Sequence, residues 1–190
     1  MHEPIQIGIA LTGSFCTLHR VLEDLAPLAE KYALYPIMSP IVYESNTRFG
    51  SAALFRERLE KLCGRPIWHT IPEVEPIGPK KLLDALIIAP CTGNTLAKLA
   101  LGVTDTAVTM AAKSTLRNDR PVIIGLSTND AMSGAAKNIG LLQSLRNYYF
   151  IPYGQDDAES KPRSCVAHFD LMGETLEAAL EGRQLQPLVW

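Results

Sequence analysis

Runs of consecutive apolar residues alternate along the chain with segments in which apolar residues recur every three or four positions. The runs have the length of strands, and strands that are apolar throughout are typical of a parallel sheet buried on both faces. They occupy residues 5–11, 33–38, 86–89, 121–126 and 148–152. The periodic segments predict helices over residues 18–28, 51–63, 96–102, 106–116, 133–146 and 171–181. This alternation predicts a three-layer α/β fold with a doubly wound parallel sheet, in one domain over residues 1–190.

The segments between these elements have weaker patterns. Residues 41–50 are predicted to form a polar loop, 65–69 a short strand, 71–79 an irregular segment because of its prolines, and 154–164 a charged, mobile loop. Pro90 lacks a backbone donor and is expected to end the strand before it. Ser51 and Asp170 are expected to cap the helices that follow them, and Thr104 or Asp105 the helix over 106–116.

Small polar residues follow four of the predicted strands. In a parallel sheet such turns meet at the carboxyl edge, where open α/β sheets bind ligands. The turns contain Gly13, Ser14, Phe15, Ser39, Pro90, Thr92, Gly93, Asn94, Thr95, Ser127 and Asn129. Because they offer hydroxyls, amides and backbone N–H groups rather than acids or metal ligands, they predict a site for a phosphate and a heterocycle, with no metal. In the competing interpretation these are ordinary turns and Ser14 is only a helix N-cap.

Missing motifs narrow the choice of nucleotide. No G-x-G-x-x-G follows the first strand, where only Gly8 and Gly13 occur, and the chain has no G-K-S or G-K-T of a P-loop. The second strand ends at Ser39-Pro40, where a dinucleotide site usually has an acidic residue for the ribose. FMN, with one phosphate and no adenine half, fits these turns.

Composition and charge limit the partners and the compartment. The formal net charge is −2, so neither nucleic acid nor an anionic membrane is expected to bind. No apolar stretch has the length of a membrane span, and the first residues do not resemble a signal peptide, which predicts a cytoplasmic protein. Cys16, Cys63, Cys91 and Cys165 form no C-x-x-C pair and are expected to be buried. Cys91 is a candidate reactive thiol because a helix begins after it.

Residues 90–100 resemble the Pro-Ala-x-Ala-Asn-Thr signature of the FMN-binding flavoproteins, a family that includes cysteine decarboxylases, phosphopantothenoylcysteine decarboxylases and flavin prenyltransferases. Residues 127–132 lie where those decarboxylases have Pro-Ala-Met-Asn-x-x-Met, and they retain the Asn and the second Met as Asn129 and Met132. Gly13-Ser14 matches the family's phosphate turn. The resemblance covers most of residues 1–145 in the same order, and it implies the Rossmann-like flavoprotein fold.

The chain also departs from the decarboxylase pattern. The catalytic histidine of those enzymes corresponds to Pro76, and the first Pro of their second motif corresponds to Leu126. Without the imidazole, cysteine decarboxylation lacks its acid–base group. These variants, with the sequences around Gly13 and Asn129, are most similar to the family of dipicolinate synthase B subunits.

This closer similarity implies a flavin-binding subunit that takes part, during sporulation, in oxidising dihydrodipicolinate or its hydroxytetrahydro precursor to dipicolinate. It implies FMN as cofactor, a dehydrogenase-like A subunit as the partner that carries NAD(P), a trimer-based homo-oligomer and a location in the mother cell. Ser14 would then hold the FMN phosphate, and Asn94, Thr95 and Ser39 would contact the ribityl chain and the ring edge.

Asn129, Met132 and Arg48 are the catalytic candidates under this resemblance, with the first two on the substrate side. A cyclic dicarboxylate substrate needs cationic partners, and Arg48, Lys98 and Lys137 are nearest by motif placement. Taken singly, each of these cations is better explained as an ordinary surface charge.

Two other functions fit the same residues. One is an FMN-dependent decarboxylase or a flavin prenyltransferase-like enzyme. The other is a non-catalytic scaffold for a dehydrogenase partner, because a missing histidine is also expected in a protein that has lost its activity.

Overall fold

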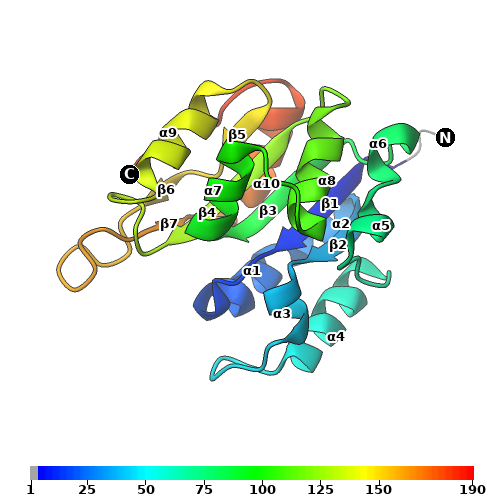
Figure 1. The fold of residues 1–190 in the computed structure, drawn as a ribbon, viewed down its shortest axis with the longest axis horizontal. Coiled ribbons are helices and arrows are strands. Elements are labelled where there is room, and N and C mark those ends of the chain that lie inside the picture. The colour runs from blue at the N-terminus through cyan, green and yellow to red at the C-terminus, as the bar shows by residue number, and fades with distance from the viewer. Residues whose placement is uncertain (1–3) are drawn as a thin grey trace.

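A seven-stranded sheet forms the centre of the protein in the computed structural model, which describes residues 4–190 (Figure 1). Five strands are parallel, in the order β2-β1-β3-β4-β5, and the antiparallel strands β7 and β6 continue the sheet from the last residues of β4. Their bounds are β1 Gln6–Leu11, β2 Ala33–Met38, β3 Ala85–Cys91, β4 Val122–Thr128, β5 Tyr148–Phe150, β6 Tyr153–Gly154 and β7 Cys165–Ala167. The doubly wound fold is confirmed. The sheet is mixed rather than wholly parallel, because β7 pairs antiparallel with β4 and β6. The sequence does not predict β6 and β7, because they are too short to produce an apolar pattern.

Helices cover both faces of the sheet (Figure 1). One face carries α1 Leu18–Asp24, α2 Ala26–Lys31, α4 Ala52–Cys63 and α10 Met172–Leu180. The other carries α5 Ile71–Val74, α6 Ile77–Lys80, α7 Gly93–Leu101, α8 Ala107–Leu116 and α9 Ala136–Ser144. Alternate strand residues point to opposite faces, so Ile87 belongs to the first core while Leu86 and Ile88 belong to the second. The sheet is buried on both faces, as its apolar strands predict.

Short helices replace some of the predicted irregular segments. The predicted loop 41–50 begins with α3, Pro40–Glu44, and the proline-rich segment 71–79 contains α5 and α6. Proline fits the first turn of a helix, where the missing N–H has no partner to lose, and α3 and α5 each have a proline there. The predicted strand 65–69 is also wrong, since this segment forms only one bridge, between Ile37 and Trp68.

One of the predicted helix caps is confirmed, and the others differ from the expectations. Ser51 caps α4 by accepting a hydrogen bond from the Leu54 N–H. Thr106, rather than Thr104 or Asp105, caps α8, and Asp170 lies inside the short helix η2 (Phe169–Leu171) instead of capping α10. α9 begins at Ala136 because a turn occupies the residues before it.

Pro90 does not end β3, because the strand continues to Cys91, which pairs with Leu126 after an irregularity in register. The ladder resumes past the proline, whose carbonyl oxygen accepts hydrogen bonds from Thr12.

The cysteines correct one further expectation. Cys91 and Cys165 are buried and Cys63 is partly buried, but Cys16 is exposed, and all four are free thiols. Burial raises the pKa of the Cys91 thiol far above its usual value, so the position before α7 does not activate it. Burial likewise raises the pKa of Cys63 to about 12. In the chain from residue 4 onward, none of the helices has the length and apolar character needed to span a bilayer.

Candidate functional site

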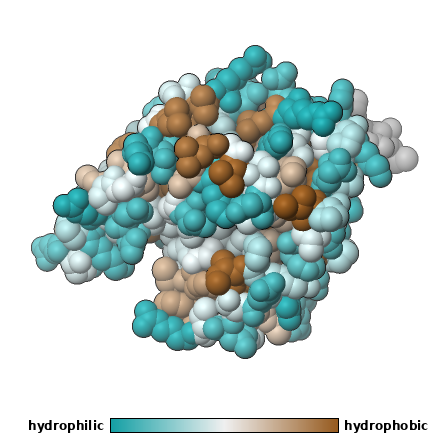
Figure 2. Space-filling model, in the orientation of Figure 1, coloured by the Kyte–Doolittle hydropathy of each residue, from teal (hydrophilic) through white to brown (hydrophobic). Residues whose placement is uncertain are grey.

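A cavity of about 850 Å3 lies at the carboxyl edge of the sheet, beside the loops that follow β1, β3 and β4. The loop between β6 and β7 forms its opposite wall. Figure 2, in the orientation of Figure 1, shows a notch between this projecting loop at the left and the part of the molecule below it, which contains α1, α3 and α4. This first cavity is lined by Gly13, Ser14, Phe15, Cys16, Arg48, Phe49, Thr92, Gly93, Asn94, Ser127, Thr128, Asn129, Asp130, Asp156, Lys161, Ser164 and Val166. Most of the residues predicted to bind a cofactor therefore meet in one place.

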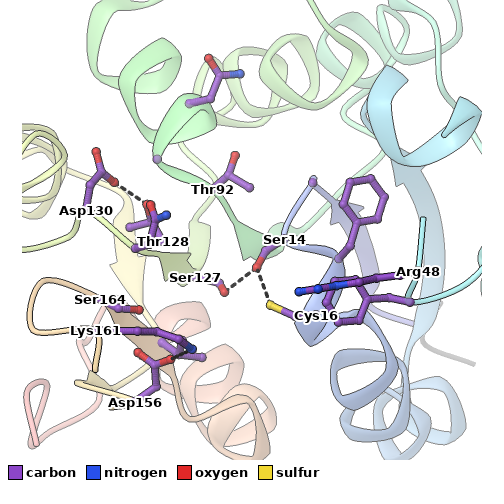
Figure 3. A pocket seen from close by; sticks show the side chains of 17 residues that line it. Ser14, Cys16, Arg48, Thr92, Ser127, Thr128, Asp130, Asp156, Lys161 and Ser164 are labelled. Carbon is purple, nitrogen blue, oxygen red and sulfur yellow. Dashed lines mark hydrogen bonds and ion pairs between the residues drawn. The ribbon is translucent and has the colours of Figure 1, made fainter. Parts of the chain in front are cut away.

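Ser14 and Ser127 join the loop after β1 to the last residues of β4 (Figure 3). Their Oγ atoms are 2.7 Å apart, so one hydroxyl donates to the other and the pair keeps one proton to donate to a ligand. Ser14 makes no side-chain capping bond to the helix η1 (Phe15–Thr17) that follows it. The interpretation of Ser14 as only an N-cap is therefore wrong.

Thr12 fixes the relative position of the loops after β1 and β3. Its hydroxyl donates to the Pro90 carbonyl oxygen at 2.7 Å and accepts from the Thr92 N–H at 3.0 Å. The Thr92 hydroxyl caps α7 by accepting from the Thr95 N–H. Since Thr12 is buried, this wall of the cavity is held by bonds that water does not reach.

Two cations line the first cavity in different states. The Lys161 ammonium lies 3.2 Å from Asp156 Oδ2. Burial alone would raise the pKa of Asp156, but hydrogen bonds from Ser164 and Lys161 outweigh burial and lower it. The Arg48 guanidinium lies over the Phe49 ring, 4.8 Å from its centroid, and pairs with no carboxylate of residues 4–190. Arg48 is therefore the cation left to pair with an anionic ligand.

A carboxylate also lies at the start of α7. Thr128 Oγ1 donates to Asp130 Oδ1 at 2.5 Å (Figure 3). Both of these oxygen atoms lie close to Gly93. A Cβ atom on Gly93 would lie 2.8 Å from each of them, closer than real Cβ contacts come. Glycine at this position therefore leaves room for the Thr128–Asp130 pair.

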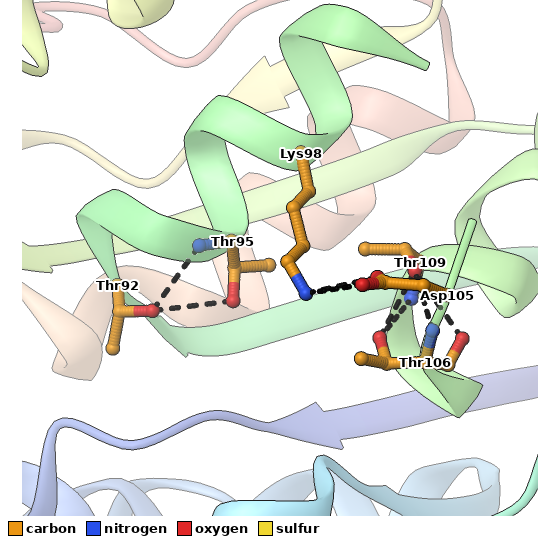
Figure 4. Close-up of polar contacts among 6 residues, drawn as sticks. All are labelled: Thr92, Thr95, Lys98, Asp105, Thr106 and Thr109. Carbon is orange, nitrogen blue, oxygen red and sulfur yellow. Dashed lines mark hydrogen bonds and ion pairs between the residues drawn. The ribbon is translucent and has the colours of Figure 1, made fainter. Parts of the chain in front are cut away.

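Ser39 and Thr95, predicted to act with Ser14, line a second cavity of about 390 Å3. Gly13, Thr92 and Asn94 line both cavities. The second cavity is lined by Thr12, Gly13, Ser39, Pro40, Ile41, Thr92, Asn94, Thr95, Lys98 and Thr106. Lys98 forms an ion pair there with Asp105 at 2.7 Å (Figure 4). Ser39 Oγ is buried and has no hydrogen-bond partner in the described part of the chain.

Other predicted residues lie elsewhere. Pro90 is buried inside β3 and lines neither cavity, because the strand continues through it. Met132 is exposed and lines a third cavity, of about 490 Å3, with Tyr153 and Trp190, since the turn after β4 carries it away from Asn129. Lys137 is exposed on α9 and lines none of these three cavities.

Sequence reasoning missed several residues of the first cavity. They are Cys16, Phe49, Thr128, Asp130, Asp156, Lys161, Ser164 and Val166. Thr128 and Asp130 carried a local signal, a hydroxyl and an acid two residues apart directly after a buried strand. No local signal marked the other four residues on the β6–β7 side, because they reach the cavity only through the pairing of β6 with β7. They are Asp156, Lys161, Ser164 and Val166.

Comparison with known proteins agrees with the fold and the motifs. Residues 1–167 match the sequence profile of the flavoprotein family. The B subunit of dipicolinate synthase from Bacillus subtilis (strain 168) is 45% identical over 185 residues, covering 97% of this chain and 92% of that protein.

Solved structures give the same picture. The crystal structure of the dipicolinate synthase B subunit from Bacillus halodurans has a TM-score of 0.90 and 42% identity, covering 98% of this chain and 96% of that chain. The FMN-dependent cysteine decarboxylase SpaF has a TM-score of 0.65 at 18% identity, covering 94% and 96%, and shares the fold. By sequence profile and by near full-length similarity, this chain belongs to the flavoprotein family.

Proposed function

We propose that this chain is the flavin-binding subunit of a dipicolinate synthase. With a dehydrogenase-like partner that carries NAD(P), it takes part in oxidising dihydrodipicolinate, or its hydroxytetrahydro precursor, to dipicolinate. The observation that carries the proposal is the 45% identity to a dipicolinate synthase B subunit over 97% of this chain. The chemistry of the first cavity supports it independently.

The first cavity fits FMN in size and in donors. Its volume of about 850 Å3 lies within the range of small-molecule and cofactor sites. The spare proton of the Ser14–Ser127 pair and the unpaired Arg48 guanidinium suit a phosphate. The side-chain amides of Asn94 and Asn129 both donate and accept, which suits the edge of a flavin ring. Bound there, FMN would supply a two-electron acceptor.

The same cavity argues against cysteine decarboxylation. Pro76, at the position of the decarboxylase histidine, is the N-cap residue of α6. Across residues 4–190, no histidine lines the first cavity. Oxidation of a ring that becomes aromatic requires a hydride acceptor and a proton acceptor, and it does not require that imidazole.

The flavin is tested on the purified chain alone. Titration with FMN is expected to raise the melting temperature and to quench flavin fluorescence, because a ligand that binds only the folded state stabilises it. Ser14→Ala and Ser127→Ala are expected to weaken binding, and Asp119→Asn, an exposed change before β4, serves as the control. A chain that shows no thermal shift with excess FMN would contradict the cofactor assignment.

The reaction is tested by co-expression with the dehydrogenase-like partner. Dipicolinate is followed by its ultraviolet absorbance after addition of dihydrodipicolinate or its hydroxytetrahydro precursor, with and without FMN. Product formed equally well without this chain would contradict the proposed role in the synthase. Light scattering on the same material tests the proposed homo-oligomer, for which a multiple of three chains is expected.

A further inference from the structure

Five ionisable groups line the first cavity, and neither Arg48 nor Asp130 belongs to an ion pair within residues 4–190. The five groups are Cys16, Arg48, Asp130, Asp156 and Lys161. Asp156 and Lys161 form an ion pair, and Arg48 is a permanent cation that cannot accept a proton. Cys16 Sγ contacts Ser14 Oγ at 3.9 Å. Asp130 is therefore the carboxylate of this cavity that has no cationic partner in the described chain.

The Asp130 side chain is not needed to form its own turn. The turn after β4 is closed by the main-chain oxygen of Asp130, which accepts from the N–H groups of Ser133 at 2.9 Å and Ala135 at 3.1 Å. Within residues 4–190 the carboxylate receives one hydrogen bond, from Thr128 Oγ1. Since an ionised carboxylate has about four acceptor sites, Asp130 retains the capacity to accept from a molecule in the cavity.

Gly93 lies against Thr128 and Asp130, although it comes from a different segment of the sheet edge. The flavoprotein signature has Ala at the position of Gly93, and the second motif has Met at the position of Thr128. A Cβ at Gly93 would lie 2.8 Å from both Thr128 Oγ1 and Asp130 Oδ1. Two of the departures from these motifs, one from each, therefore meet at a single contact on the wall of the first cavity.

We infer that Asp130 accepts the proton that the substrate ring loses in the oxidation proposed above, with Thr128 as its positioning residue. The inference rests on that proposed function. The substrate of this step is dihydrodipicolinate, which the hydroxytetrahydro precursor gives by losing water. One ring C–H leaves with its electron pair as hydride, to an acceptor of the flavin or nicotinamide class. The neighbouring ring atom loses a proton to the Asp130 carboxylate, and the electrons of that bond form the new ring double bond. The products are the aromatic dicarboxylate, the reduced acceptor and a neutral Asp130.

The first test compares Asp130→Asn with wild type in the complex with its partner. Asparagine keeps the shape but accepts no proton, so kcat is expected to fall about 100- to 10,000-fold, the usual contribution of a general base. FMN affinity is expected to stay within about threefold. Asp119→Asn, exposed in a left-handed backbone conformation that asparagine tolerates, is the matched control with unchanged kcat.

Chemical rescue separates proton transfer from structure. Asp130→Ala opens a space in which formate can replace the lost carboxylate. Added formate is therefore expected to raise the kcat of this variant at least tenfold, whereas a merely structural role predicts no increase. Asp130→Glu is expected to recover part of the activity. Thr128→Val, which leaves the carboxylate but removes its donor, is expected to lower kcat about tenfold.

The outcomes distinguish this inference from the proposed function. If wild type makes dipicolinate and Asp130→Asn does so within threefold of the wild-type rate, the role of Asp130 is wrong and the proposed function stands. Failure of formate to rescue a folded, FMN-binding Asp130→Ala also overturns it. If the wild-type complex makes no dipicolinate, the proposed function fails and the inference fails with it.

Discussion

Thr12 and Ser39 follow the neighbouring parallel strands β1 and β2, and both side chains are buried, yet their hydroxyls are in opposite states. The Thr12 hydroxyl has two partners, at Pro90 and Thr92, whereas Ser39 Oγ has none in residues 4–190. A buried polar group without a partner costs about 1–3 kcal/mol. One hydroxyl therefore stabilises the loops, and the other remains available to a ligand.

The cations of the first cavity repeat this contrast. Lys161 is paired with Asp156, while Arg48 contacts only an aromatic ring. Groups with partners are expected to affect stability and groups without partners to affect binding. Four substitutions, from the largest effect to the smallest, test this division.

Thr12→Val is expected to be the most disruptive. It removes the hydroxyl and leaves the Pro90 carbonyl and the Thr92 N–H without that partner, so the free energy of unfolding is expected to fall by about 2–4 kcal/mol. Urea denaturation measures the change. Thr12→Ser keeps the hydroxyl and is the control, expected to lose less than half as much. Equal losses in the two variants would contradict a role for the hydroxyl.

Arg48→Met is expected to weaken FMN binding by about 10- to 100-fold, because it removes a charge-assisted contact worth about 1.5–3 kcal/mol. Fluorescence titration at low and high salt measures it, and the salt dependence of binding is expected to shrink. Arg65→Met is the matched control, since Arg65 also lies over an aromatic ring, that of Tyr35, but lines none of the three cavities. If both variants weakened FMN binding to a similar extent, the prediction that Arg48 contacts the ligand would be wrong.

Ser39→Ala is expected to leave the unfolding free energy of the ligand-free protein unchanged or slightly higher, since no hydrogen bond is lost. FMN affinity is expected to fall about fivefold, or about 1 kcal/mol, if the cofactor reaches from the first cavity into the second. Unchanged affinity with unchanged stability would show that the flavin stops at Gly13 and Thr92, which both cavities share.

Lys161→Met is expected to have the smallest effect, under about 0.5 kcal/mol at neutral pH, because the ion pair is partly exposed. The pKa of Asp156 is lowered below its ordinary 3.8 in the folded state, so its contribution is present above that value and is lost as pH falls through the folded pKa. Unfolding free energies of variant and wild type are therefore expected to converge as the pH falls below the folded-state pKa of Asp156. A difference that persists at the acid end would contradict this origin.

The sequence predicted those parts of the fold in which one physical cause dominates. β2 was predicted over its observed residues, Ala33–Met38, because a strand buried on both faces is apolar throughout. The short helix α5 is not predicted because prolines are taken to exclude a helix over 71–79, although proline suits a first turn. The short helix α3 is not predicted because the polar residues after it favour a loop over 41–50. β6 and β7 were missed because two or three residues carry no periodicity.

The site was predictable as far as strand order determines it. Ser14 and Asn94 follow parallel strands and Ser127 lies near the end of one, so the carboxyl edge brings them together. The separation of Ser39 into a second cavity depends on how the loops after β1 and β3 bond to each other, which no local pattern encodes. The arrival of Asp156 depends on a hairpin between distant residues.

Gly93 restricts the order in which mutations could have produced this cavity. With the alanine of the flavoprotein signature, a methyl carbon would lie 2.8 Å from both Thr128 Oγ1 and Asp130 Oδ1. A sequence that gained the acid first would therefore have to move the Asp130 carboxylate or the Thr128 hydroxyl away from the methyl group. Loss of the methyl group lets the pair take its present position, so a transplant of the Thr128–Asp130 pair into an alanine-bearing relative needs glycine at this position as well.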